Sequence, residues 1–166
     1  MIHDPRRRGE ALADFHAELA PRLFLDLEPA IAAEAPGGRV PPQARDEWAC
    51  FALYACVRGL VAAGGFNRET GAAIDALHEH ALARWPSGGD PAALRRRVSE
   101  RYAEYGAIGQ EGGASGAATV TRRLGEAAAR HLAAGAPSGA LAELVGALHE
   151  SLAEGAADAV RAASDG

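Results

Sequence analysis

The chain has 166 residues, of which 48% are hydrophobic, and a formal net charge of -5. This length and apolar content predict one compact domain with a sizeable core and exclude disorder for the bulk of the chain. All 17 basic residues are arginine. The lack of lysine excludes Schiff-base sites, phosphate-binding loops that end in Gly-Lys-Ser/Thr, and Ser-Lys nucleophile pairs.

The apolar residues are mostly Ala and Leu rather than Val, Ile or aromatic residues. Unbranched side chains lose little rotamer freedom in a helix, so this composition favours helix over strand. The sequence therefore predicts an all-α fold, a single-domain bundle of about six helices that spans residues 1–166.

The first predicted helix carries an apolar stripe with a spacing of three or four residues: Leu12, Phe15, Leu19, Leu23, Leu27 and Ala30. Pro21 interrupts this stripe and predicts a kink or a split. The segment before the stripe has charge but no apolar core, so it does not resemble a secretory signal. Residues 35–42, APGGRVPP, are expected to form a loop.

The second predicted helix, residues 42–63, ends where Gly64 and Gly65 offer a left-handed cap. Its large apolar side chains cover nearly the whole circumference, which predicts a central position in the bundle. The segment approaches the length of a membrane span, yet Arg58 and five alanines argue against one, and we expect no membrane contact.

Asn67 is expected to cap a third helix, and Asp90 followed by Pro91 predicts the start of a fourth that runs to about Tyr105. Five glycines between residues 106 and 116 predict a flexible Gly-rich loop. A fifth helix is expected over 115–134.

Ser138 can cap the sixth helix, which carries a stripe of leucines: Leu141, Leu144, Leu148 and Leu152.

Cys50 and Cys56 lie six residues apart on the second helix, which places them roughly 240° apart around its axis. They cannot form a disulfide with each other there. Both are expected to be small buried apolar side chains in a reducing compartment, so we predict a cytoplasmic location.

Arg58 lies in the middle of the apolar second helix and has no evident solvated face. A guanidinium withdrawn from water needs a carboxylate or a bound anion. We therefore expect Arg58 to pair with a carboxylate on a neighbouring helix or to hold an anion. The candidate carboxylates are Asp75, Glu79, Glu100 and Glu104.

Helical spacing also turns other polar groups inward, and His149 flanks its apolar stripe. Facing helices in a bundle build ligand sites from such residues. The candidate ligand-binding set is Arg58, Arg101, Tyr102, Tyr105, His16, His78 and His131. The alternative is that these side chains lie at the edge of the core, or form ion pairs that tie helices together.

Asp75 and His78 have the i, i+3 spacing of a carboxylate-histidine metal motif. None of His16, His131 and His149 has an acidic residue three positions earlier, so the sequence predicts no metal and no cofactor.

The Gly-rich loop follows no strand and contains no lysine, which argues against a phosphate site. Ser115 does not match a nucleophile elbow, because Ala117 stands where that motif has Gly.

The one strong basic cluster inside a predicted helix is Arg95, Arg96 and Arg97 with Arg101 beyond it. The chain is acidic overall and has 5% aromatic residues, and Arg95 and Arg96 are expected to face solvent. We therefore expect no nucleic-acid partner.

No catalytic constellation is complete in this sequence. We expect a small cytoplasmic helical protein that works without catalysis by binding a protein partner or itself, as a homodimer. The alternative is a ligand-binding or catalytic bundle with an Arg/His/Tyr-lined pocket for a small anionic ligand.

Overall fold

The computed structural model describes residues 4–85, 87–111 and 116–165. Within these ranges the chain forms helices and no strand, which confirms the all-α prediction. The elements are α1 (Pro5–Glu34), the 3₁₀ turn η1 (Pro36–Gly38), α2 (Ala44–Gly64), α3 (Arg68–Ala83), α4 (Pro91–Glu111), α5 (Ala117–Ala133) and α6 (Gly139–Asp165).

Short polar side chains begin four of the helices, three of them at positions that the sequence indicates. Asn67 accepts from the Thr70 amide at 2.9 Å, and Asp90 accepts from the Ala92 amide at 3.2 Å. The Ser138 hydroxyl accepts from the Ala140 amide at 3.3 Å. Asp4 caps α1 by accepting from the Arg6 amide. These contacts satisfy amides that lack a partner within their helix.

Of the kink or split predicted near Pro21, the split is wrong, because α1 continues through Pro21 and Pro29 to Glu34. Proline removes one helical hydrogen bond and disturbs the preceding turn. Pro21 is itself exposed, while Ala20 and Phe24 on either side of it are buried in the core. Burial on both sides of the proline holds the two halves of α1 in one helix.

The predicted loop over residues 106–116 begins too early. Helix α4 continues through Gly106 and Gly109 to Glu111, and Ile108 in this last part packs against the core. Glycine weakens a helix but does not stop one whose apolar side chain is anchored. Residues 112–115, and with them Ser115, lie outside the described residues.

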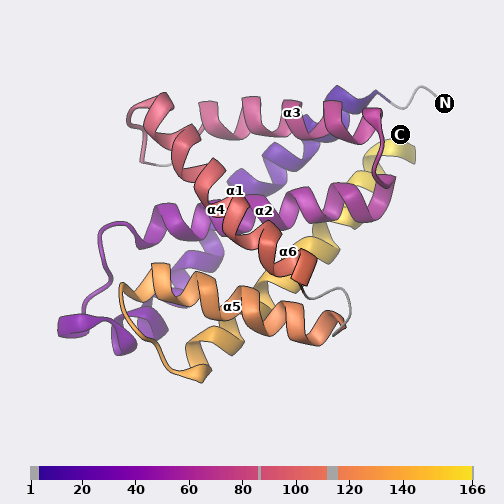
Figure 1. Ribbon diagram of the computed structural model, residues 1–166. Helices are drawn as coiled ribbons and strands as arrows, with labels where there is room; N and C mark the ends of the chain where they lie inside the picture. The colour runs from indigo at the N-terminus through magenta and orange to yellow at the C-terminus, as the bar shows by residue number, and fades with distance from the viewer. Residues whose placement is uncertain (1–3, 86, 112–115, 166) are drawn as a thin grey trace.

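Helix α2 runs through the middle of the bundle, between α3 and α5 (Figure 1). It packs most extensively against α6 and also contacts α1, α3, α4 and α5. Twelve of its residues are buried, which confirms its central position. The terminal helices α1 and α6 also contact each other, and Arg8 Nε donates to Ser164 Oγ at 3.1 Å.

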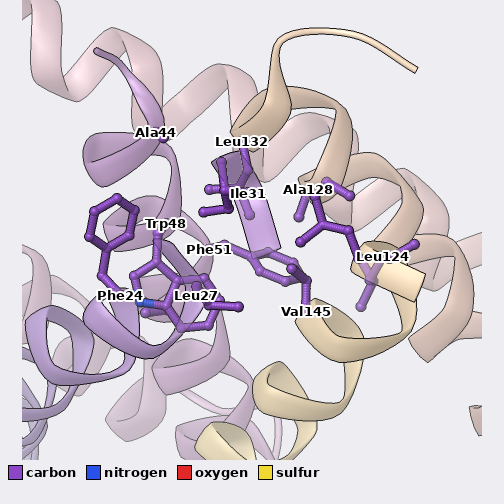
Figure 2. Close-up of a cluster of buried hydrophobic side chains, with 14 of the residues drawn as sticks. Phe24, Leu27, Ile31, Ala44, Trp48, Phe51, Leu124, Ala128, Leu132 and Val145 are labelled. Atoms are coloured by element: carbon purple, nitrogen blue, oxygen red, sulfur yellow. The ribbon is translucent and has the colours of Figure 1, made fainter. Parts of the chain in front are cut away.

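The core divides into two clusters on either side of α2. One joins α1, α2, α5 and α6 around Trp48 and Phe51, where Leu27 and Val145 meet them (Figure 2). The other joins α1, α2, α3 and α6 around Leu53 and contains both Cys50 and Cys56, which are free and buried. Burial therefore agrees with the expected role of the two cysteines as small apolar side chains.

Two glycines set how closely α6 approaches its neighbours. A Cβ on Gly59 of α2 would lie 2.6 Å from the Ala156 Cβ and 2.9 Å from the Ala153 carbonyl oxygen. A Cβ on Gly125 of α5 would overlap the Ala142 carbonyl oxygen. The helices therefore pack backbone against backbone, which a chain rich in small residues allows.

Among the described residues, α2 is the one helix long and apolar enough to cross a membrane, and 61% of its apolar window is buried inside the protein. Its hydrophobicity is accounted for by its place at the centre of the bundle.

Candidate functional site

Arg101 on α4 forms the most enclosed ion pair described in the protein, and its partner is Glu47 in the first turn of α2. Nε and Nη2 of Arg101 donate to the two carboxylate oxygens at 2.7 and 2.8 Å. The Glu47 side chain is 5% exposed and that of Arg101 is 19% exposed. Hydrogen bonding to Glu47 raises the pKa of Arg101 above its ordinary value. The guanidinium stays charged and its carboxylate partner fully occupies one edge of it.

Tyr102, the next residue of α4, pairs with a histidine of α3. Its hydroxyl lies 2.8 Å from His78 Nε2. Burial raises the pKa of Tyr102 well above its ordinary value and lowers the pKa of His78, against a smaller upward effect of Asp75. Both groups are therefore neutral at neutral pH, and they tie α4 to α3.

Tyr105 completes this face of α4 and enters an aromatic cluster with His149 of α6. The Tyr105 ring lies 5.0 Å from Phe51 and 5.5 Å from Tyr54, and the His149 ring lies 4.0 Å from Phe51 and 5.9 Å from Tyr54. Among the described residues, the Tyr105 hydroxyl has no hydrogen-bond partner, and the His149 ring has only a contact with the Phe51 backbone that falls short of normal hydrogen-bond geometry.

Both side chains are at most 1% exposed. Burial raises the pKa of Tyr105, and burial with the charge of Arg58 lowers the pKa of His149 to about 3. His149 therefore stays uncharged in the folded protein.

Arg58 lies at the edge of the α2–α6 interface, not in a closed interior. Its Nη1 donates to Glu150 Oε1 at 2.6 Å, and the two side chains are 31% and 32% exposed. Thr121 of α5 donates to the same oxygen at 3.0 Å. The expectation of a counter-charge is confirmed, but it comes from α6 and not from the four candidate carboxylates on α3 and α4. Arg58 opens onto a shallow hollow whose α6 side includes Glu154, Asp158 and Arg161, so its guanidinium reaches water.

The two remaining histidines of the candidate set lie apart from each other. His131 of α5 lies 2.7 Å from Glu104 of α4. His16 lies between α1 and α2, where its Nε2 is 2.9 Å from the Ala49 carbonyl oxygen, and its ring stacks at 5.9 Å on Trp85.

The structure thus brings Arg101, Tyr102 and Tyr105 together on one face of α4 but pairs most of the candidate set with separate partners. Each cation is matched by a carboxylate, and the buried tyrosines stay protonated. This arrangement ties α4 to α2, α3 and α5, which is the ion-pair alternative that the sequence left open.

The described residues contain no group of three or more His, Cys, Asp or Glu side chains placed to hold a metal ion. His80 Nε2 lies 3.3 Å from Glu10 Oε1, and Arg6 Nε donates to the same oxygen at 3.2 Å.

A groove between α5 and α6 is the most spacious of the described hollows, with a volume of about 610 Å³. Small side chains form much of its lining, and three charged residues lie among them: Arg122 and Glu126 on α5, and Glu143 on α6. Arg122 Nη1 contacts Glu126 at 3.0 Å, and the Arg122 side chain is 66% exposed. None of the described residues forms an ion pair with Glu143, so this rim has an unmatched carboxylate.

Comparison with known protein families, with curated proteins and with solved structures gives no match to this chain. The function therefore has to be argued from the surface and the interior of the chain itself.

Proposed function

We propose that this protein is a non-catalytic helical module that associates with a second copy of itself through the groove between α5 and α6. The observation that carries the proposal is the groove itself: it is about 610 Å³ in volume, it is lined by the exposed small residues Ala118, Gly139 and Ala147, and the buried Ala142 and Gly146 lie beneath them where α5 meets α6. Small residues let another helix approach closely, as Gly125 and Gly146 already do within the chain.

The charges on the rim favour a second copy as the occupant. In a twofold symmetric contact, a residue i of one copy meets residue j of the other, and the reverse contact occurs as well. Arg122 on one rim and Glu143 on the other would then form two equivalent ion pairs across the axis. The intrahelical pair of Arg122 with Glu126 is exposed and weak enough to be exchanged.

A cytoplasmic setting is part of this proposal. It is supported by two buried cysteines that are free of disulfides.

Light scattering coupled to gel filtration tests the association. We expect a mass near twice the 17.1 kDa of one chain. Ala147→Glu adds a carboxylate to the groove beside Glu143 and should give the monomer. Ala163→Glu makes the same change on an exposed part of α6 outside the groove, and should leave the dimer intact.

Charge reversal provides the sharper test of the interface. Glu143→Arg should weaken the dimer by like-charge repulsion with Arg122 of the other copy, and Arg122→Glu combined with Glu143→Arg should restore it. A wild-type mass near 17.1 kDa at micromolar concentrations contradicts the proposal. So does an Ala147→Glu variant that dimerises as well as the wild type.

A further inference from the structure

A narrow cleft opens between α1, α2 and α3, remote in the chain from the α5–α6 groove. Its polar lining consists of His16, Arg45 and Arg84, and its apolar walls include Phe24 and Trp48. The enclosed volume is about 40 Å³. A cavity needs roughly 10 to 15 Å³ on this measure to hold one water molecule, so the enclosed part admits only a few heavy atoms.

His16 lines this cleft and is the one lining residue whose neutral side chain can offer a ring nitrogen as a hydrogen-bond acceptor. It is 4% exposed, and its Nε2 faces the Ala49 carbonyl oxygen at 2.9 Å. A carbonyl accepts, so Nε2 carries the proton and the neutral ring has its lone pair on Nδ1. None of the described residues forms a hydrogen bond with Nδ1, and this atom is not completely buried. Burial lowers the pKa of His16, and the nearby charge of Arg84 lowers it further, which keeps the ring neutral.

Two guanidinium groups flank the same cleft. Arg84 Nη1 contacts Asp14 at 2.8 Å, and Arg45 Nη2 lies 3.9 Å from Glu28 while its guanidinium packs 5.4 Å from the centre of the Phe24 ring. Neither carboxylate lines the cleft. Each guanidinium has five N–H donors, so both arginines retain donors for an oxyanion at the mouth.

We propose that this cleft binds a short organic anion that also carries a hydroxyl or amide N–H group. Its carboxylate lies between Arg45 and Arg84, its donor group reaches Nδ1 of His16, and its carbon atoms contact Trp48. The arginines supply charge, the histidine selects for a donor, and the volume limits the length of the ligand. The site is independent of the self-association proposed above.

The full-length protein can be tested with glycolate, which has both groups, by following the His16 ring and Trp48 indole signals in NMR spectra. Acetate lacks the donor and ethylene glycol lacks the charge, so the pair separates the two contributions. We expect saturable shifts with glycolate at millimolar concentrations. Acetate should bind about tenfold more weakly, as expected for one lost hydrogen bond, and ethylene glycol should give no saturable shift.

Arg45→Gln and Arg84→Gln should each weaken glycolate binding several-fold. Arg39→Gln, at an exposed arginine outside the cleft, is the matched control and should leave binding unchanged. All three changes lie at the surface, so folding is retained. The proposal is overturned if glycolate gives no saturable shift, if the cleft variants bind like the control, or if acetate binds as well as glycolate.

Discussion

Replacing Arg101 with methionine would leave the Glu47 carboxylate buried without either of the two hydrogen bonds that Arg101 donates to it. Methionine retains much of the aliphatic packing of arginine but cannot compensate the charge. Removing one partner of a buried ion pair costs about 3 to 5 kcal/mol, because the other charge stays withdrawn from water. The Glu47 side chain is 5% exposed, so this range applies to it.

Arg58→Met is the matched comparison, because it removes an ion pair between side chains that are each about a third exposed. Water can solvate the Glu150 carboxylate, so the expected loss is about 0 to 1 kcal/mol. The double replacement of Glu47 with leucine and Arg101 with methionine removes both charges, and it should recover most of the stability that Arg101→Met loses.

Urea unfolding followed by far-ultraviolet circular dichroism measures these differences. If Arg101→Met and Arg58→Met agree within about 0.5 kcal/mol, the range usual for surface changes, then the Glu47–Arg101 pair is not an enclosed pair. The same conclusion follows if the double variant is no more stable than Arg101→Met.

Three further predictions follow from groups in the interior. Burial and Arg58 lower the pKa of His149 from 6.5 to about 3, so the unfolded chain takes up a proton that the folded protein does not. The free energy of unfolding should therefore fall as the pH drops from 6.5 towards 3, by about 2 kcal/mol between about pH 7 and about pH 5. Urea unfolding measured at several pH values tests this, and His149→Phe should remove this part of the pH dependence. Gly125→Ala forces a methyl group onto the α6 backbone and should destabilise by about 1 to 3 kcal/mol. By contrast, the methyl group of Gly106→Ala points into open space on α4, and this variant should be more stable by about 0.5 to 1 kcal/mol. Equal unfolding midpoints for the two variants would contradict the close approach of α5 and α6. Burial raises the pKa of Cys50 and of Cys56 to about 12, so labelling by a thiol reagent should require opening of the fold, and rapid reaction of native protein would show that the thiols are accessible.

Helix positions and most caps could be predicted because they depend on neighbouring residues in the sequence. Asn67, Asp90 and Ser138 each act within three residues of themselves, so the short-range pattern contains the information. Pro21 is different, because the local rule of helix disruption competes with burial of Ala20 and Phe24 against distant parts of the chain. The sequence of α1 alone does not reveal that packing energy.

The partners of the buried charges depend on how helices cross, which spacing within one helix does not determine. Arg58 faces α6 and forms an ion pair with Glu150, although the sequence made the carboxylates of α3 and α4 equally suitable partners. The burial of Glu47 could have been predicted from the sequence. It lies in the first turn of a helix that is apolar on all sides, and such a helix is buried together with the residues on it. The same reasoning that singled out Arg58 applies more strongly to Glu47.

His149 shows why a stripe of large side chains misplaces a buried face. The leucine stripe of α6 placed His149 at its flank, but Leu144 is 40% exposed and His149 is 1% exposed. The buried face includes Ala142, Gly146, Ala153, Ala156 and Ala157, which large-residue counting ignores. Small residues bury little area each, yet they bring the backbones of α2, α5 and α6 close together, and the closest approach decides which face turns inward. Val145 and Leu152, one turn before and after His149, are buried on the same face. In a chain this rich in Ala and Gly, the small residues therefore widen the inward face beyond the leucine stripe, and His149 lies inside the widened face.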